Sequence, residues 1–202
     1  MPPRWKRSNA RAEGKTEISF DGPAFRALER FPPELARLEG LRYASLSQNS
    51  VSDLSALSGH TGLQILWFFS SAVSNLNALS DPTGLRFLYL SQSSVSELPV
   101  MAGLEELEAL MLDGTNVLDL RPLRWLPKLG TDEFQRLTFH DTPATAADTE
   151  LARLSEIKGE KERARETLAY LNSLPPWPAP LHPRRPPRWH TAPAHRRGAQ
   201  AA

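Results

Sequence analysis

Residues 107–123 read L-E-A-L-M-L-D-G-T-N-V-L-D-L-R-P-L, and the same pattern recurs through the middle of the chain at a fixed spacing. Four copies begin at Leu41, Leu63, Leu85 and Leu107, which lie 22 residues apart. With each of these leucines as position one, position eleven is always valine and position fourteen is always leucine. A fixed period of this length predicts a solenoid, because one such unit buries its apolar side only by stacking on its neighbours.

The pattern resembles the leucine-rich repeat family, specifically its 22-residue, internalin-like bacterial class, which reads L-x-x-L-x-L-x-x-N-x-V-x-D-L-x-x-L. The resemblance implies an α/β solenoid, a right-handed superhelix with one short parallel strand per repeat on its concave face and turns or 3₁₀ segments on its convex side. The residues agree with this expectation, because positions four and six alternate as in a strand. The later leucines lie three residues apart, as a tight helical turn would place them.

The repeat continues in weaker form at both ends, so we expect the solenoid to occupy residues 16–145. Upstream, Ile18 and Phe20 form an apolar pair with strand spacing. Downstream, the pattern resumes at Phe134 after a shift of five residues, which predicts that residues 130–133 bulge out as a small insertion.

Residues 146–174 are predicted to form a C-terminal helical cap, because a solenoid leaves an open apolar end that must be covered. Two short amphipathic helices are expected at about 148–158 and 160–173, with Asp148 or Thr149 at the first N-terminus. The many charged side chains of the second helix are interpreted as a solvated surface.

The two ends of the chain differ in composition from its body. Residues 1–15 form a basic segment, and residues 175–202, here called the Pro/Arg-rich segment, hold eight prolines, five arginines and no acidic residue. This composition predicts disorder with polyproline II character. Within it Pro183, Pro186 and Arg188 match the P-x-x-P-x-R pattern that SH3-type grooves accept, although so Pro-rich a segment produces that match easily.

Charge and composition exclude several classes of function. The net charge is +1, but the two basic ends leave residues 16–174 with 14 basic and 22 acidic side chains, which argues against nucleic-acid binding by the body. There is no cysteine, which excludes disulfides, thiol nucleophiles and cysteine-ligated metals. No apolar run is long enough to span a membrane and no secretory signal is visible, so we expect a cytoplasmic protein.

No catalytic motif is present with the required spacing. The sequence contains no G-x-G-x-x-G, no G-x-x-x-x-G-K-[ST] and no H-E-x-x-H. His60 and His140 lie more than three repeats apart, and His140 with Asp141 lacks a neighbouring nucleophile. We therefore expect no enzymatic activity, no metal site and no cofactor.

Two polar features are interpreted as structural. Position nine is always polar: Asn49, Ser71, Ser93 and Thr115. These side chains are expected to point inward and hydrogen-bond loop backbone groups. His60 occupies a position where later repeats carry leucine, so it is expected to be half-buried on the convex side.

The concave face holds the strongest functional signal. Positions three, five and seven should project from the sheet, and in the middle repeats they are aromatic or apolar, whereas the leucine columns already fill the core. Trp67 and Tyr89 should lie on adjacent strands about 4.8 Å apart. The candidate partner-binding residues are Tyr43, Ile65, Trp67, Phe69, Phe87, Tyr89, Met111 and Asp113.

We expect this surface to bind a protein partner, which the acidic Glu108, Asp113 and Asp141 predict to be partly basic. Three alternatives stay open. The aromatic side chains could instead pack on one another or on a terminal segment, of which the Pro/Arg-rich segment is one candidate. The chain could form a homodimer through an edge of the solenoid. It could also be a regulatory subunit of an enzyme.

Overall fold

The computed structural model of the chain describes residues 17–21, 25–81, 84–131 and 136–175. The basic N-terminal segment and most of the Pro/Arg-rich segment, with Pro183, Pro186 and Arg188, lie outside the described residues. The same is true of Phe134 and of the second half of the expected insertion.

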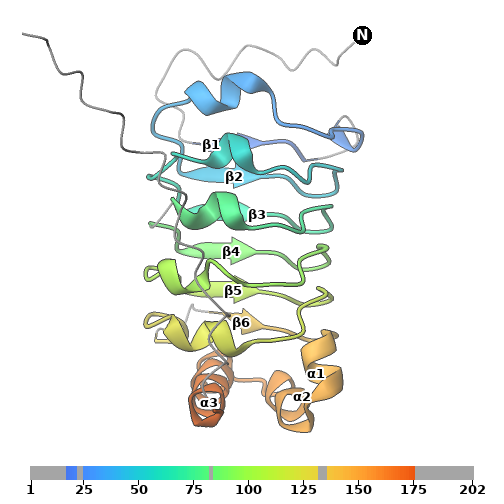
Figure 1. Cartoon of the computed structure of the whole chain (residues 1–202), viewed down its shortest axis with the longest axis vertical. Coiled ribbons are helices and arrows are strands. Elements are labelled where there is room, and N and C mark those ends of the chain that lie inside the picture. Colours follow the sequence, from blue (N-terminus) through green and yellow to red (C-terminus); the bar gives the residue numbers. More distant parts are fainter. Residues whose placement is uncertain (1–16, 22–24, 82–83, 132–135, 176–202) are drawn as a thin grey trace, which may run out of the picture.

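Six short strands form one parallel sheet in chain order, stacked one after another along the molecule (Figure 1). The strands are β1 (Glu17–Ser19), β2 (Tyr43–Ser45), β3 (Ile65–Trp67), β4 (Phe87–Tyr89), β5 (Ala109–Met111) and β6 (Leu137–Thr138). Each repeat pairs in register with the next, so Leu66 lies beside Leu88 and Leu88 beside Leu110. The pairing of Leu110 with Leu137 confirms the predicted five-residue shift before the last strand.

Most turns on the convex side contain a short 3₁₀ segment. These segments are η2 (Pro33–Arg37), η3 (Ser55–Leu57), η4 (Asn77–Ser80), η5 (Met101–Gly103) and η6 (Arg121–Trp125). The side chain at position thirteen accepts a backbone hydrogen bond at the start of this turn. Asp53 Oδ1 accepts from the Ser55 N–H at 2.8 Å, and the Oδ1 atoms of Asn75 and Asp119 accept from the N–H two residues later in their own repeats. In the third repeat Pro99 has no N–H to donate, and η5 begins two residues later than η3.

The core consists mainly of the leucines and valines that recur at the same positions in each repeat, and these side chains are almost fully buried. The chain leaves each strand through a left-handed residue at position eight, with φ of 58° at Gln48, 52° at Ser70 and 59° at Gln92. Non-glycine residues rarely take this conformation, and its repetition marks the corner where each strand turns away from the sheet.

The position-nine side chains are buried as predicted, but only some find a partner. Asn49 accepts a hydrogen bond from the Val51 N–H at 3.0 Å, and the Thr115 hydroxyl donates to the Leu112 carbonyl at 2.7 Å. The hydroxyls of Ser71 and Ser93 have no hydrogen-bond partner. The structural interpretation therefore holds for Asn49 and Thr115 but not for the two serines.

His60 is more buried than expected, at 8% exposure, because it fills a leucine position between two convex loops. Its Nε2 has no hydrogen-bond partner.

Three helices lie beyond β6 and form the C-terminal cap (Figure 1). They are α1 (Pro143–Ala147), α2 (Thr149–Ser155) and α3 (Glu160–Ser173). Helix α1 was not expected, because the solenoid was predicted to continue to residue 145. Thr142 nevertheless closes a capping box with Thr145, which starts the helix. Asp148 is the N-cap of α2, accepting hydrogen bonds from Glu150 and Leu151 N–H groups.

The interpretation of all α3 charges as a solvated surface is wrong for one residue. Arg163 is only 6% exposed, and its Nε donates to the Leu137 carbonyl of β6 at 2.6 Å while its Nη1 donates to the Ile157 carbonyl at 2.6 Å. Because no further repeat follows β6, this arginine replaces the backbone N–H that a seventh strand would supply.

The expected bulge also needs correction at its first residue. Gly130 is buried under α3, and a Cβ added there would lie 2.3 Å from the Cβ of Ala164. The connection before β6 is therefore packed against the cap at Gly130, and glycine is required by this close approach and by a φ of +75°.

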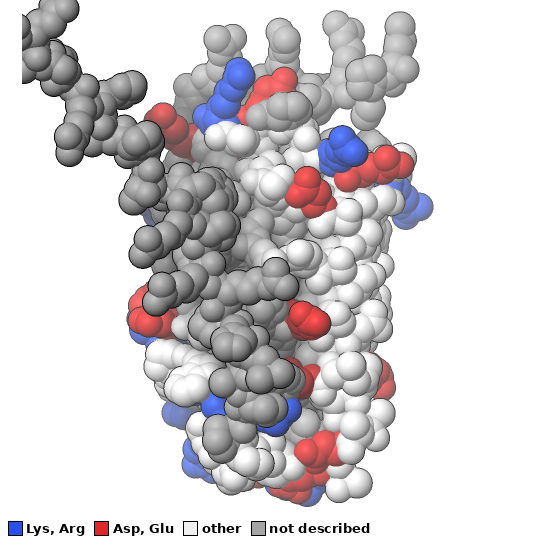
Figure 2. Space-filling view, viewed as in Figure 1, with Lys and Arg blue, Asp and Glu red and all other residues white. Residues whose placement is uncertain are grey.

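Charged side chains gather mostly toward the two ends of the solenoid on the face shown in Figure 2, with few of them between. No helix within residues 17–175, as far as they are described, is long and apolar enough to cross a membrane.

Candidate partner-binding surface

Two rows of side chains run across the middle strands, because the sheet is parallel and in register. Position three places Tyr43, Ile65 and Phe87 side by side, and position five places Trp67, Tyr89 and Met111 side by side. Together with Phe69 at position seven they form what we call the concave aromatic surface: Tyr43, Ile65, Trp67, Phe69, Phe87, Tyr89 and Met111.

The centre of this surface is a stacked aromatic pair. The rings of Trp67 and Tyr89 lie with centroids 4.0 Å apart and an interplanar angle of 28°. Partial burial in this stack raises the pKa of the Tyr89 hydroxyl above its ordinary value. Register pairing on adjacent strands therefore produces the neighbourhood that the sequence predicted.

Exposure is concentrated in two of the candidate residues. Trp67 is 38% exposed and Phe69 is 39% exposed, whereas Tyr43, Ile65, Phe87, Tyr89 and Met111 are half-buried because each packs against its row neighbours. Two other residues of these rows lie on the same face but are not exposed as expected. Ser45 is 2% exposed beside Trp67, and Ala109 is 1% exposed beside Phe87, because both side chains are small.

Most charges near the surface are already paired. Arg86 makes a bidentate ion pair with Glu108, at 2.7 and 2.9 Å, and its guanidinium lies 5.4 Å from the ring centroid of Phe87. This pair holds Glu108 against the neighbouring repeat, so its charge is largely neutralised. Glu108 therefore no longer supports the prediction of a partly basic partner, which rested on three acidic residues.

Asp113 is half-buried in the turn after β5, where its carboxylate binds groups of the next repeat. Its Oδ1 accepts the His140 N–H at 2.8 Å, and its Oδ2 accepts the Thr138 hydroxyl. Asp21 does the same at the other end, where its Oδ1 accepts the Ser47 N–H at 2.7 Å. Asp113 therefore joins two repeats, and we separate it from the concave aromatic surface although the sequence placed it among the binding residues.

His140 and Asp141 lie in the turn after β6, and Asp141 has a φ of +53°. The Nδ1 of His140 lies 3.4 Å from Glu156 Oε1. No group of three or more histidine, aspartate or glutamate side chains in the described part of the chain could hold a metal ion.

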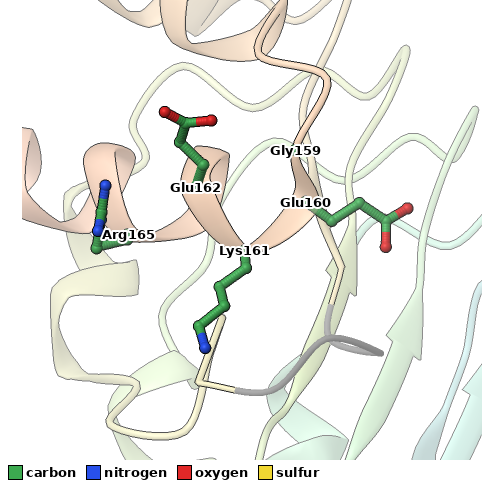
Figure 3. Close-up of a pocket in the computed structure, with 5 residues that line it drawn as sticks. All are labelled: Gly159, Glu160, Lys161, Glu162 and Arg165. Carbon is green, nitrogen blue, oxygen red and sulfur yellow. The ribbon is translucent and has the colours of Figure 1, made fainter.

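Two hollows lie away from the concave aromatic surface. One surrounds the start of α3 and is lined by Gly159, Glu160, Lys161, Glu162 and Arg165. Figure 3 shows that its charged side chains point in different directions and do not converge. The other, of about 490 Å³, lies between the convex loops at residues 36–41 and 58–62 and includes His60. Neither brings together groups that would perform a reaction.

Two exposed apolar residues were missed by the sequence interpretation. Leu118 is 69% exposed and Trp125 is 63% exposed. A signal was available, because Leu118 breaks a position-twelve column that is otherwise serine, and Trp125 breaks a position-nineteen column of glycine and aspartate. Both lie outside the concave aromatic surface.

Comparison with solved structures identifies the fold. An internalin from Listeria monocytogenes matches with a TM-score of 0.50 and 29% sequence identity, covering 55% of this chain and 31% of that one. Internalin C2 of the same organism matches with a TM-score of 0.53 and 25% identity over 57% of this chain and 49% of that one. The chain has the leucine-rich-repeat fold.

A leucine-rich-repeat protein of Leptospira interrogans is a third match, with a TM-score of 0.54, 25% identity, and coverage of 64% of this chain and 33% of that one. This leucine-rich-repeat chain thus spans between about a third and a half of the length of the solved proteins it matches. No family model and no curated protein sequence matches it.

Proposed function

We propose that the chain is a non-catalytic interaction module that binds a protein partner on the concave aromatic surface. The likeness to leucine-rich-repeat proteins supports protein interaction in general. The observation that carries the finer proposal is the exposure of Trp67 and Phe69 on a rigid sheet whose core is already filled. Exposed aromatic clusters of this kind are typical of binding surfaces.

The proposal assigns most of the binding energy to the stacked pair. Trp67 and Tyr89 are held in place by register pairing and by each other, so little side-chain freedom is lost when a partner binds. Truncation of either one is expected to weaken binding by about 2 kcal/mol, roughly 30-fold.

The non-catalytic part of the proposal is supported by the partners of His140, the histidine nearest the sheet among the described residues. His140 faces Glu156, and its backbone N–H is bound by Asp113. Neither contact places a nucleophile beside the imidazole, which a general base would need.

Affinity capture from a lysate of the source cell tests the proposal. The Trp67→Ala/Tyr89→Ala chain is compared with the unaltered chain and with Trp125→Ala, which removes an equally large exposed aromatic side chain elsewhere. Circular dichroism checks that all three fold. We expect partners that are retained by the unaltered chain and by Trp125→Ala and lost from the double variant; an unchanged set of partners would remove the concave aromatic surface as the site.

Self-association is a second candidate function, and it is favoured because β1 is an edge strand of the sheet. Within the described residues β1 pairs only with β2, so its other edge is available for a strand of a second copy. This candidate predicts a mass in solution that rises with concentration and that does not change on Trp67→Ala. An activity assay on a captured partner would identify the regulatory-subunit alternative.

A further inference from the structure

The middle of the concave aromatic surface presents ring faces and almost no free charge. Trp67 and Tyr89 offer their stacked rings, and the arginines beside them are paired, Arg86 with Glu108 and Arg136 with Glu160. An occupant therefore needs apolar contact area that does not depend on ion pairs at the centre. Polyproline II segments meet this requirement, because aromatic-lined surfaces bind their rigid, already extended backbone at low entropic cost.

The chain itself carries a segment of this composition. Residues 175–202 contain eight prolines and five arginines and no acidic residue. Exposed acidic side chains lie toward both ends of the sheet: Glu17 in β1 at one end, and Asp141 and Glu156 beyond β6 at the other. An apolar centre with acidic ends is complementary to prolines interspersed with arginines.

The position of Pro175 allows the segment to reach this surface in its own molecule. Helix α3 packs on β6 and η6, and Arg124 of η6 donates a hydrogen bond to the Leu171 carbonyl near the helix end. The eight residue-to-residue steps from Pro175 to Pro183 span on the order of 25 Å as polyproline II. The separation of β6 and β4 is about 10 Å, which leaves about 15 Å for the path around the last repeat.

We infer that residues 176–202 bind the concave aromatic surface of the same molecule, and that a protein partner must displace them. This inference rests on the proposed function and names the regulation of the same surface. A covalent tether of this length gives an effective concentration in the millimolar range, so even weak contacts keep the surface occupied.

Paramagnetic relaxation on the full chain tests the inference. The chain has no cysteine, so Ala192→Cys provides a single attachment point for a nitroxide label. We expect the label to broaden the amide signals of β3 and β4 and to leave those of η3 on the convex side sharp. The broadening should be lost in Trp67→Ala/Tyr89→Ala and in Pro183→Ala/Pro186→Ala/Pro187→Ala, and kept in Trp125→Ala. The proline variant lies outside the solenoid, so its folding is not at risk.

Sharp β3 and β4 signals in the labelled, folded chain would overturn the inference. So would broadening that appears only between a labelled molecule and a second, isotope-enriched one, because the segment would then bind another copy of the chain.

The capture experiment distinguishes failure of this inference from failure of the proposed function. If capture depends on Trp67 and Tyr89 while the label has no effect, the proposed function stands and this inference fails. If the label broadens β3 and β4 while capture is unchanged in the double variant, the segment does bind this surface, but the proposed function fails and with it the displacement of the segment by a partner.

Discussion

Arg163 shows how a single residue can terminate a repeating structure. Its guanidinium donates to the carbonyls of Leu137 and Ile157, and no carboxylate of the described residues pairs with it. An unpaired buried carbonyl at the last strand would lose a hydrogen bond to water without replacement. The arginine prevents this loss and at the same time fixes α3 against the final repeat.

Replacing Arg163 by methionine should lower the free energy of unfolding by about 3 kcal/mol, because two carbonyls lose a charged donor. Arg165, exposed on the same helix, is the matched control, and Arg165→Met should change stability by no more than about 0.5 kcal/mol. Urea unfolding measures both, and hydrogen exchange should quicken at β6 more than at β3. Equal effects of the two variants would contradict the role of Arg163.

Gly130 is the second residue on which the cap depends. Gly130→Ala should cost about 3 kcal/mol, because the new methyl group meets Ala164 and the left-handed backbone disfavours a side chain. Gly40 has a similar φ of +74° but open space around it, so Gly40→Ala measures the backbone strain alone. We expect the thermal midpoint to fall much less in Gly40→Ala. The same loss in both variants would show that the close contact with Ala164 is unimportant.

Some residue-scale features were predictable from the sequence and others were not. The burial of positions four, six, eleven and fourteen followed from the repeat columns alone. Ser45 and Trp67 share a column yet differ in exposure, because side-chain size decides which of two neighbours covers the other. Arg163 could not be distinguished from Arg165, because its role depends on where the sheet ends in space.

Helix α2 owes its start to Asp148, which connects two helices of the cap. Its Oδ1 accepts two backbone N–H groups and its Oδ2 accepts the Tyr170 hydroxyl of α3 at 2.7 Å. Burial raises the pKa of Asp148, but these three hydrogen bonds outweigh it and lower the pKa below its ordinary value of 3.8.

Because the folded-state pKa of Asp148 is lowered, its ionised form stabilises the fold above pH 3.8, and this contribution is lost as the pH falls through the lowered value. Asp148→Asn should therefore reduce the free energy of unfolding by about 1 kcal/mol at pH 7. The difference from the unaltered chain should shrink in strongly acidic buffer. Thermal unfolding from pH 7 to pH 2 measures this, and a difference that is constant across that range would contradict the account.

The elements themselves were predicted unevenly. Strand positions, the shift before β6 and the span of α3 followed from apolar spacing, which is a local property. Helix α1 and the late start of η5 did not. Thr142 serves both as a repeat residue and as a helix cap, and Pro99 removes a donor that the other repeats use.

At the scale of the whole molecule, stability and recognition are carried by opposite sides of the same strands. Leu88 and Tyr89 are adjacent in β4, but Leu88 is fully buried in the core whereas Tyr89 lies in the concave aromatic surface. The sequence predicted this division, because strand residues alternate between faces. It could not predict which of the outward residues stay exposed.

Substitutions on the two faces of β3 and β4 should therefore have opposite effects on partner binding and on stability. Trp67→Ala/Tyr89→Ala should lose partner binding and cost only about 1 kcal/mol of stability from the lost stack. Leu88→Ala should cost about 3 kcal/mol through the cavity it leaves, and it should still bind the partner at temperatures where it is folded. Chemical unfolding and binding measured on the same preparations compare them. A double variant that unfolds as readily as Leu88→Ala would assign the aromatic pair to stability.

The most direct test of the central claim is site-specific photocrosslinking in the source cell. A photoreactive phenylalanine analogue replaces Trp67 in one preparation and Trp125 in another, since both positions carry exposed tryptophans. The account predicts a crosslinked partner protein from position 67 and none from position 125. A crosslink to another protein from position 125 alone would contradict the claim that the concave aromatic surface is where the partner binds.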